Sequence, residues 1–392
     1  MDLGMSPLCE SFVSREYLNH MEPFYPLHAF VCAECFLVQV PTLVSGEEIF
    51  GGEYAYFSSY SDSWLRHAAA YVDMITERLG LDKHSQVVEV ASNDGYLLKN
   101  YVQRGIPVLG IEPAANVAEK AIRDHHVPTL SNFFDDDLAA RLRKEGRAAD
   151  LVHAHNVFAH VPDPNRFAAG LKKLLKGDGL GLIEAPYVRD FIDQLEFDTI
   201  YHEHYSYFSL HAATDLFARH GLAVVDVEHV PIHGGTLRYF VGHEGMEVGR
   251  RVDAMLCEER EAGVCNFPYY QKFADRVWRL KHDLKSLLAE LGAQQKRVAA
   301  YGASAKGSTL MNAFEIGGDE IEFVVDRSTV KQGCFTPGTH IPILAPEALL
   351  DKRPDYVLLL TWNFAEEILE QQSAYRDSGG RFIVPVPEVR VV

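Results

Sequence analysis

A short apolar run that ends in a polar turn is the sequence feature that most constrains the fold. Residues 86–91 are rich in apolar and β-branched side chains, which predicts a buried strand. The turn Asn93-Asp94-Gly95 follows at once, and residues 95–103 are predicted to form the next helix. A buried strand that leads directly into a helix is typical of a parallel sheet covered by helices.

The same alternation of strands and helices recurs along most of the chain. Further strands are predicted at residues 108–111, 151–155 and 181–184, and, beyond a helical stretch at 247–292, at residues 297–301, 322–326 and 356–361. We therefore expect an α/β fold with a doubly wound sheet and a second, Rossmann-like α/β domain. The predicted domains are a small N-terminal module (1–65), the first sheet domain (66–245), and a helical linker with the second sheet domain (246–392).

Size and charge exclude several classes of function. The chain has 392 residues, which is too many for one typical core. With 37 Lys and Arg against 55 Asp and Glu, its net charge is −18, which argues against nucleic-acid binding. We find no signal peptide, and no apolar run reaches the roughly 18 residues that a membrane span needs. We expect a cytoplasmic enzyme with no membrane partner.

The acidic residues near the first turn predict a ligand site. Glu89 lies in the first strand, and Glu112 ends the second strand 23 residues later, where a carboxylate can hold ribose hydroxyls. Gly95 allows the backbone to approach a ligand closely. Ligands of such sheets bind at the carboxyl ends of the strands. The alternative is an acidic strand end with a tight turn and no ligand.

The glycine content of the turn indicates which cofactor would bind. Only Gly95 is present, so the loop lacks the Gly-x-Gly-x-x-Gly pattern that cradles a pyrophosphate. This favours S-adenosylmethionine over NAD, and it predicts that the first sheet is that of an S-adenosylmethionine methyltransferase. The predicted cofactor contacts in this sheet are Glu89, Ser92, Asn93, Asp94, Gly95, Glu112 and Asn156.

Several motifs, in one order, extend the argument to nearly the whole chain. They are Cys32-Ala33-Glu34-Cys35, Tyr56-Phe57-Ser58-Ser59-Tyr60, Glu89 to Tyr96, Tyr201-His202-Glu203-His204-Tyr205, His233-Gly234-Gly235-Thr236-Leu237-Arg238, and Tyr301-Gly302-Ala303-Ser304-Ala305-Lys306-Gly307. With these motifs the chain resembles the three-domain nucleotide-sugar C-methyltransferases of deoxysugar pathways. The resemblance adds Tyr56 and Ser58 to the predicted cofactor contacts.

The resemblance implies methyl transfer to carbon on a 4-keto-6-deoxy sugar carried by a nucleoside diphosphate, often dTDP. A carbon beside a ketone can lose a proton to a well-placed base, and the resulting enolate can attack a sulfonium methyl group. The resemblance points to His204 as that base, with Tyr201 and Glu203 in the same site. Tyr201 could donate a hydrogen bond to the enolate oxygen, and Glu203 could orient His204 or bind the sugar.

The residues alone leave the choice of histidine open. In an extended segment, Tyr201 and Glu203 would share one face, whereas His202 and His204 would share the other. Either histidine could then be the base, and His202 is a candidate for substrate contact. A metal pair formed by His202 and His204, or two purely structural histidines, are the alternatives.

Two glycine-containing segments are candidates for binding the nucleotide sugar. His233, Gly234 and Arg238 are predicted to position the substrate, because the glycine allows close approach and the guanidinium can meet a phosphate. Lys306 would contact the diphosphate or the sugar from a loop that opens a helix, since backbone N–H groups at such a position bind anions. The alternatives are a β-turn with a surface arginine and a scaffold loop without a ligand.

Cys32 and Cys35 have the spacing of metal ligands, and the resemblance implies a structural zinc site of two such pairs. A first pair is missing, so we expect a truncated zinc-binding-like module in which Cys32 and Cys35 are the candidate ligands of a structural zinc ion. The partner predicted is a small nucleotide-sugar substrate, and the protein is expected to be a monomer or a small homo-oligomer. Competing functions are an O- or N-methyltransferase, a non-catalytic binding protein that retains the fold, and an NAD oxidoreductase.

Overall fold

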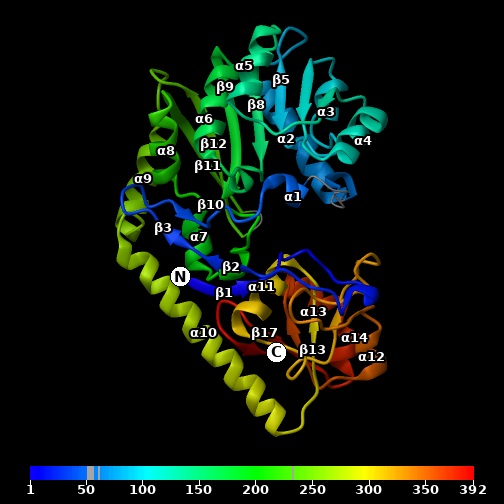
Figure 1. Cartoon of the computed structure of the whole chain (residues 1–392). Helices are drawn as coiled ribbons and strands as arrows, with labels where there is room; N and C mark the ends of the chain where they lie inside the picture. Colours follow the sequence, from blue (N-terminus) through cyan, green and yellow to red (C-terminus); the bar gives the residue numbers. More distant parts are fainter. Residues whose placement is uncertain (51–56, 61, 232–233) are drawn as a thin grey trace.

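A computed structural model covers the chain and describes all residues except 51–56, 61 and 232–233. Two large sheets lie at opposite ends of the molecule, and the long helix α10 (Phe267–Ala293) runs along one side of it from the first sheet domain to the second (Figure 1). Within the described residues, every helix is too short or too polar to cross a bilayer.

The first sheet has seven strands. They are β5 (Val87–Val90), β6 (Val108–Ile111), β7 (Thr129–Leu130), β8 (Ala149–His155), β9 (Leu175–Pro186), β11 (Leu222–Val230) and β12 (Thr236–His243). The order is β11-β12-β9-β8-β5-β6-β7, with β5 to β9 parallel and β12 antiparallel to both of its neighbours. The prediction of a doubly wound methyltransferase-type sheet is confirmed.

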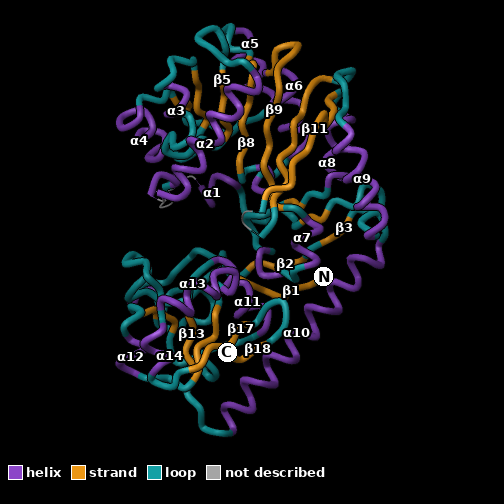
Figure 2. The backbone as a smooth tube through the Cα atoms, turned by 180° about the vertical axis from the view of Figure 1, so that it is seen from behind, coloured by secondary structure: helices purple, strands orange, loops and turns teal. Residues whose placement is uncertain are grey.

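Helices cover this sheet on both faces, as Figure 2 shows. They are α2 (Asp62–Leu79), α3 (Lys99–Val102), α4 (Ala115–His125), α5 (Asp136–Lys144), α6 (Pro164–Leu174), α8 (Leu210–Arg219) and α9 (Arg250–Ala262). Because β5 has helices on both sides, all four of its residues are buried. Side chains of Asp135, Asp163 and Ser209 accept hydrogen bonds from the first backbone N–H groups of α5, α6 and α8, which fixes where these helices begin.

The second sheet has six strands and the same architecture. They are β13 (Val298–Tyr301), β14 (Val324–Val325), β15 (Ile343–Leu344), β16 (Tyr356–Leu359), β17 (Arg381–Val384) and β18 (Arg390–Val391), in the order β15-β14-β13-β16-β17-β18. Only β18 is antiparallel to its neighbour. Its helices are α11 (Ala305–Phe314), α12 (Ala348–Lys352), α13 (Ala365–Gln371) and α14 (Ser373–Asp377). The predicted Rossmann-like domain is therefore present.

The N-terminal module contributes small sheets and no large core of its own. Its strands are β1 (Asp2–Ser6), β2 (Tyr25–His28), β3 (Phe30–Val31) and β4 (Val38–Gln39), and α1 (Gly46–Phe50) follows. β1 pairs with β2, and β4 lies between β3 and β10 (Ser206–Tyr207), so the module is joined to the segment that follows residues 201–204. Figures 1 and 2 place β1 and β2 between the two sheet domains, beside α11.

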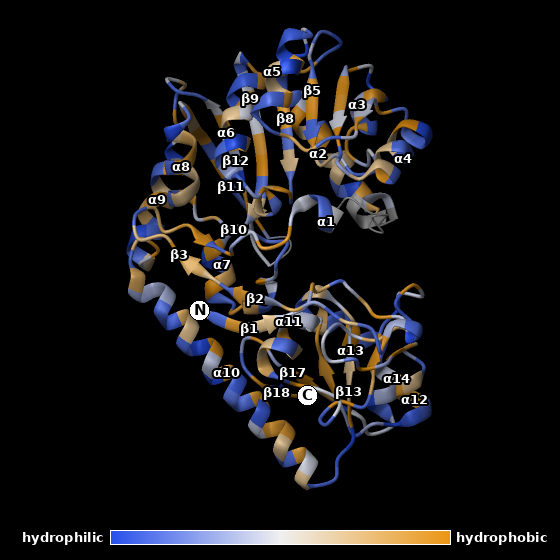
Figure 3. Cartoon of the chain, in the orientation of Figure 1, coloured by the Kyte–Doolittle hydropathy of each residue, from blue (hydrophilic) through white to orange (hydrophobic). Residues whose placement is uncertain are grey.

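One hydrophobic core joins the N-terminal module, α10 and the second sheet. Leu3 and Leu27 of the module belong to the same buried cluster as Leu284 of α10 and Val324 of β14. The apolar residues of α10 recur every three or four positions, so they form one stripe that faces this core. Figure 3 shows the same contrast, with largely hydrophobic strands β5, β8 and β13 and a mixed surface on α10.

Shortening a buried side chain in the stripe of α10 should destabilise the protein. Leu284 is fully buried, so Leu284→Ala removes packing that the neighbouring helix and sheet cannot refill, at a cost of about 2–5 kcal/mol. Urea unfolding followed by circular dichroism measures this cost. His282→Ala, at an exposed position of the same helix, is the control and should change stability by no more than about 0.5 kcal/mol. Equal effects of the two variants would contradict the shared core.

Candidate functional site

The loop after β5 has an unusual backbone. Ala91, Asn93 and Gly95 have φ angles of 54°, 48° and 79°, so every second residue adopts the left-handed conformation. This conformation is costly for residues with a Cβ atom, and such residues cluster at functional sites. The sequence pattern concealed the feature, because only one of the three positions is a glycine.

Buried carboxylates surround this loop. Glu89, Asp94 and Glu112 are 1%, 0% and 5% exposed. Glu112 follows β6 and ties the loops together, because its Oε2 accepts a hydrogen bond from the backbone N–H of Asn93 at 2.9 Å and its Oε1 accepts one from Ala114, also at 2.9 Å. The side-chain amide oxygen of Asn93 accepts a hydrogen bond from the backbone N–H of Ser58 at 2.8 Å.

The polar groups around this loop fit S-adenosylmethionine. Glu89 Oε2, Ser92 Oγ and Asp94 Oδ1 are buried and have no hydrogen-bond partner among the described residues. Burial, together with the nearby charges of Glu112 and Asp94, raises the pKa of Glu89 well above its usual range. A ligand that brings a sulfonium, an ammonium and hydroxyl groups would satisfy these atoms, whereas a pyrophosphate would meet like charge.

The loop after β8 lies at the same sheet edge. β8 is the parallel neighbour of β5, so the residues after its carboxyl end lie beside the cofactor loop. Asn156 has a φ of 53°, and its backbone N–H donates to the carbonyl of Glu184 at 3.0 Å. The short 3-10 helix Phe158–His160 follows, and it places the His160 ring edge-on to the His204 ring, with centroids 4.6 Å apart.

Residues 201–204 form a turn. The extended arrangement, in which His202 and His204 would share one face, is therefore not the one observed. The backbone N–H of His204 donates to the carbonyl of Tyr201 at 2.9 Å. The turn brings the rings of Tyr201 and His204 together, with centroids 4.1 Å apart. It directs His202 the other way, where this ring is 2% exposed and its Nε2 lies 3.3 Å from the carbonyl of Pro26.

His204 is held in one orientation. Its Nδ1 lies 2.9 Å from the backbone carbonyl of Thr199, which can only accept, so Nδ1 carries the proton and Nε2 has a free lone pair. Burial, with the neighbouring His160 and Lys306, lowers the pKa of His204 well below its usual range. The ring is therefore a neutral imidazole at neutral pH, which is the form a general base needs.

Glu203 and Tyr201 complete the cluster. Burial and the charge of Glu10 raise the pKa of Glu203 to about 7, and its Oε1 lies 3.9 Å from the thiol of Cys9. Burial also keeps the pKa of Tyr201 above its usual range, so its hydroxyl remains a donor. Glu203 makes no contact with the Nδ1 of His204, because Thr199 occupies that position. Sequence reasoning missed Thr199 and Cys9, since a backbone carbonyl and a distant thiol leave no motif.

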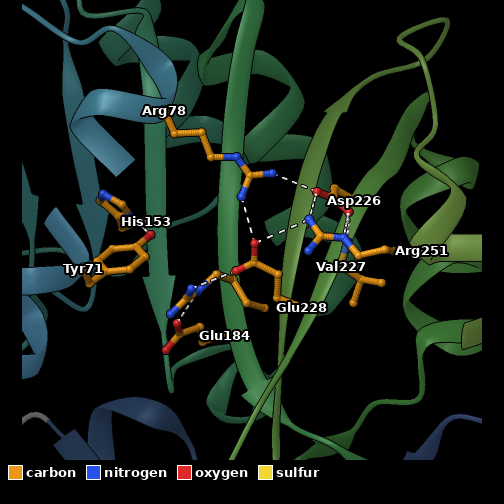
Figure 4. Close-up of polar contacts among 9 residues, drawn as sticks. Tyr71, Arg78, His153, Glu184, Asp226, Val227, Glu228 and Arg251 are labelled. Carbon is orange, nitrogen blue, oxygen red and sulfur yellow. Dashed lines mark hydrogen bonds and ion pairs between the residues drawn. The ribbon is translucent and has the colours of Figure 1, made fainter. Parts of the chain in front are cut away.

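Arg238 is part of an ion-pair network on the first sheet. Its guanidinium donates to Glu184 at 2.7 Å and to Glu228 at 3.0 Å, and it lies 4.6 Å from the centre of the Tyr71 ring. Arg78 bridges Glu228 and Asp226, each at 2.8 Å (Figure 4). Because Glu184 and Glu228 both pair with the Arg238 guanidinium, this side chain stabilises the sheet. The prediction that Arg238 meets a phosphate gains no support.

The other predicted substrate contacts lie where the domains meet. Lys306 belongs to the first turn of α11, not to a loop, because Ser304 caps this helix. Its ammonium is 3.3 Å from Glu196 and 4.8 Å from the centre of the Trp362 ring. Gly234 has a φ of 84°, and a Cβ atom there would clash with Glu196. His233 and Tyr56 lie outside the described residues.

The side chains that the structure describes do not complete a zinc site. Cys32 and Cys35 lie close together, and hydrogen bonds from the backbone of Cys35 and Glu34 lower the pKa of Cys32. Cys9, the nearest thiol in sequence, faces Glu203 instead. Among the described residues, no three His, Cys, Asp or Glu side chains gather so that they could hold a metal ion. Two thiols are half of a tetrahedral set.

Comparison with known proteins identifies the family. Residues 64–227 match a family model described as "Methyltransferase domain", residues 231–387 match "C-methyltransferase C-terminal domain", and residues 1–50 match "Putative zinc binding domain". The chain is 38% identical over 394 residues to the C-methyltransferase NovU of Streptomyces niveus, an alignment that covers 100% of this chain and 93% of NovU. The chain belongs to this family of C-methyltransferases. It is an S-adenosylmethionine-dependent methyltransferase, which disfavours the O- and N-methyltransferase, binding-protein and oxidoreductase alternatives.

Solved structures resemble parts of this C-methyltransferase more distantly. The 1,6-didemethyltoxoflavin-N1-methyltransferase of Burkholderia thailandensis is 15% identical and has a TM-score of 0.37, covering 55% of this chain and 98% of its own. The PH0226 protein of Pyrococcus horikoshii is 13% identical with a TM-score of 0.37, covering 51% of this chain and 100% of its own. Scores this low carry no argument.

Adding a methyl group at Gly95 should weaken cofactor binding by this C-methyltransferase. A Cβ atom there would lie 3.0 Å from Val127 and would strain a φ of 79°, which costs about 1–2 kcal/mol. The expected loss of S-adenosylmethionine affinity in Gly95→Ala, measured by calorimetry, is about tenfold. The control is Gly105→Ala, which carries similar strain at a φ of 71° but has open space around it. Unchanged affinity in Gly95→Ala would contradict the assigned loop.

Removing the charge of Glu203 should stabilise the protein at alkaline pH. The pKa of Glu203 is about 7 in the folded chain, whereas an unfolded Glu titrates near ~4.3. The folded state thus binds more protons between these values, and stability falls as pH rises through them. Glu203→Gln should raise Tm more at pH 8 than at pH 5. The exposed Glu34→Gln is the control, and an equal effect of Glu203→Gln at both pH values would contradict the raised pKa.

Proposed function

We propose that this C-methyltransferase acts on a nucleotide-linked 4-keto-6-deoxy sugar and methylates a carbon next to the ketone. The observation that carries the proposal is the 2.9 Å contact between Nδ1 of His204 and the Thr199 carbonyl, which places the proton on Nδ1 and leaves Nε2 to accept one. A heteroatom acceptor would already have a lone pair, whereas a carbon acceptor must first lose a proton to a base. The site therefore contains the group that carbon methylation requires.

His204 and Tyr201 have different roles in the first step, which is the removal of a proton from the carbon beside the ketone. Nε2 of His204 takes the proton from the carbon beside the ketone, and the electron pair of the broken C–H bond forms the enolate. The hydroxyl of Tyr201, whose ring lies against that of His204, donates a hydrogen bond to the enolate oxygen. S-adenosylmethionine, when bound in the loop after β5, supplies an electrophilic methyl group to this carbon.

Glu203 and Lys306 are proposed to bind the substrate. Because Glu203 does not reach His204, it is better suited to accept a hydrogen bond from a sugar hydroxyl than to orient the base. Among the described residues, Lys306 has one carboxylate partner, Glu196 at 3.3 Å, where Arg238 has two, and it lies at the start of α11, next to backbone N–H groups that favour an anion. The second sheet would then hold the diphosphate while the first sheet holds the methyl donor.

His202 and Arg238 are left out of the proposed substrate site. The first packs against the N-terminal module, and the second is neutralised by Glu184 and Glu228. We further propose that the enzyme works as a monomer or a small homo-oligomer, because both carboxyl-terminal sheet edges and the 201–204 turn come from one chain.

Deuterium exchange tests the proposal directly. Purified enzyme is incubated in deuterated water with a panel of dTDP-4-keto-6-deoxy sugars, with and without S-adenosylmethionine. We expect solvent deuterium in the ring without cofactor and a C-methylated sugar with it. His204→Ala should lower the exchange rate by about 10²–10⁴-fold, and Tyr201→Phe should lower it less. The control His202→Gln should retain most of the activity.

Two outcomes would contradict the proposal. Full activity in His204→Ala would exclude this residue as the base. Cofactor binding without exchange or methylation of any sugar in the panel would exclude this class of acceptor.

A further inference from the structure

The Thr199 carbonyl that accepts the hydrogen bond from His204 belongs to a short 3-10 helix, and contacts from the second sheet domain hold this helix in place. Thr199 ends the 3-10 helix η4 (Phe197–Thr199), and its carbonyl also accepts a hydrogen bond from the hydroxyl of Tyr207 at 3.0 Å. The position of this one oxygen therefore sets the proton on His204.

The first clamp is a buried hydrogen bond. Asp198, in the middle of η4, is fully buried, and its Oδ2 accepts from the indole N–H of Trp362 at 2.6 Å. Trp362 begins the segment that follows β16 of the second sheet. A buried carboxylate without a donor is costly, so this bond strongly favours one placement of η4. Burial raises the pKa of Asp198 to about 6, whereas Lys306 and the hydrogen bond from Trp362 act to lower it and so stabilise the carboxylate.

Two more contacts flank the first. Lys306 of α11 pairs with Glu196, the residue directly before η4, at 3.3 Å. The same ammonium lies over the Trp362 ring, so one cation stabilises both sides of the clamp. The ring of Phe197 stacks on that of Phe314 in α11, with centroids 4.6 Å apart. All three residues 196–198 are therefore held from the second sheet domain.

We infer that Trp362 is a positioning residue for the reaction: through Asp198 and η4 it holds the Thr199 carbonyl against Nδ1 of His204 and so keeps Nε2 free as the base. The inference rests on the proposed role of His204. Trp362 itself does not contact His204. Its effect on the His204 tautomer passes through Asp198 and the Thr199 carbonyl of η4. The second sheet domain thereby fixes the tautomer of the base, which belongs to the first sheet domain.

Nuclear magnetic resonance of the imidazole nitrogens tests this without a substrate. The full-length enzyme is labelled with nitrogen-15 histidine, and the His204 signals are assigned with His204→Gln. In the unmodified enzyme we expect a protonated Nδ1 and an unprotonated Nε2. In Trp362→Phe we expect this resolved pair to be lost, with the two nitrogen shifts moving toward each other as the tautomers exchange.

Two variants serve as controls. Asp198→Asn keeps an acceptor for the indole N–H and should retain the tautomer of the unmodified enzyme. Trp278→Phe changes a tryptophan on α10, 38% exposed, and should leave the His204 signals unchanged. S-adenosylmethionine affinity, measured by calorimetry, should be the same in all three variants because the loop after β5 is untouched.

The inference is overturned if Trp362→Phe keeps the resolved tautomer. It is also overturned, without any variant, if His204 in the unmodified enzyme carries its proton on Nε2, which covers the case in which Trp362→Phe does not fold. The first outcome leaves the proposed role of His204 intact, whereas a proton on Nε2 would also remove the ground for His204 as the base. Conversely, a failure of the exchange experiment on sugars would not alter the tautomer measurement, so the two proposals can fail separately.

Discussion

The reversal of strand order between β5 and β8 is the constraint on which the site depends. Parallel strands that run outward from this point must bring their following loops to one edge of the sheet, where the space between them is open. The loop at 91–95, the end of β6 at Glu112 and the segment 156–160 therefore come together at this edge, and the hydrogen bond from the Asn93 backbone N–H to Glu112 joins the first two. The turn at 201–204 reaches the same region because His204 packs against His160.

Much of this arrangement could be predicted from the sequence. Continuous apolar runs such as 86–91 identify strands buried on both faces, and the acids that follow them identify the ligand edge. The left-handed conformations of Ala91 and Asn93 could not be predicted, because neither residue type requires them. At Asn93, hydrogen bonds with Glu112 and Ser58, far away in the sequence, stabilise this conformation.

For the site residues, too, the sequence predicted some features and not others. The resemblance singled out Tyr201, Glu203 and His204, and the structure brings Tyr201 and His204 into contact. The sequence left open whether this segment is extended or turned, and a backbone hydrogen bond closes it into a turn that separates His202 from His204. Arg238 was an attractive phosphate ligand in sequence because its partners Glu184 and Glu228 lie 54 and 10 residues away and form no recognisable pattern with it.

The pairing of the N-terminal segment with the second sheet domain also bears on how the chain is made. Val13 exchanges backbone hydrogen bonds with Phe335, and Glu22 accepts from Gly338 and lies 2.7 Å from His340. On the ribosome, the first residues would emerge long before these partners are synthesised. The first sheet domain can fold during translation, before the partners of the N-terminal segment in the second sheet domain have been synthesised. Contacts so distant in sequence are slow to form, so we expect the last step of folding to be their closure over the finished second sheet.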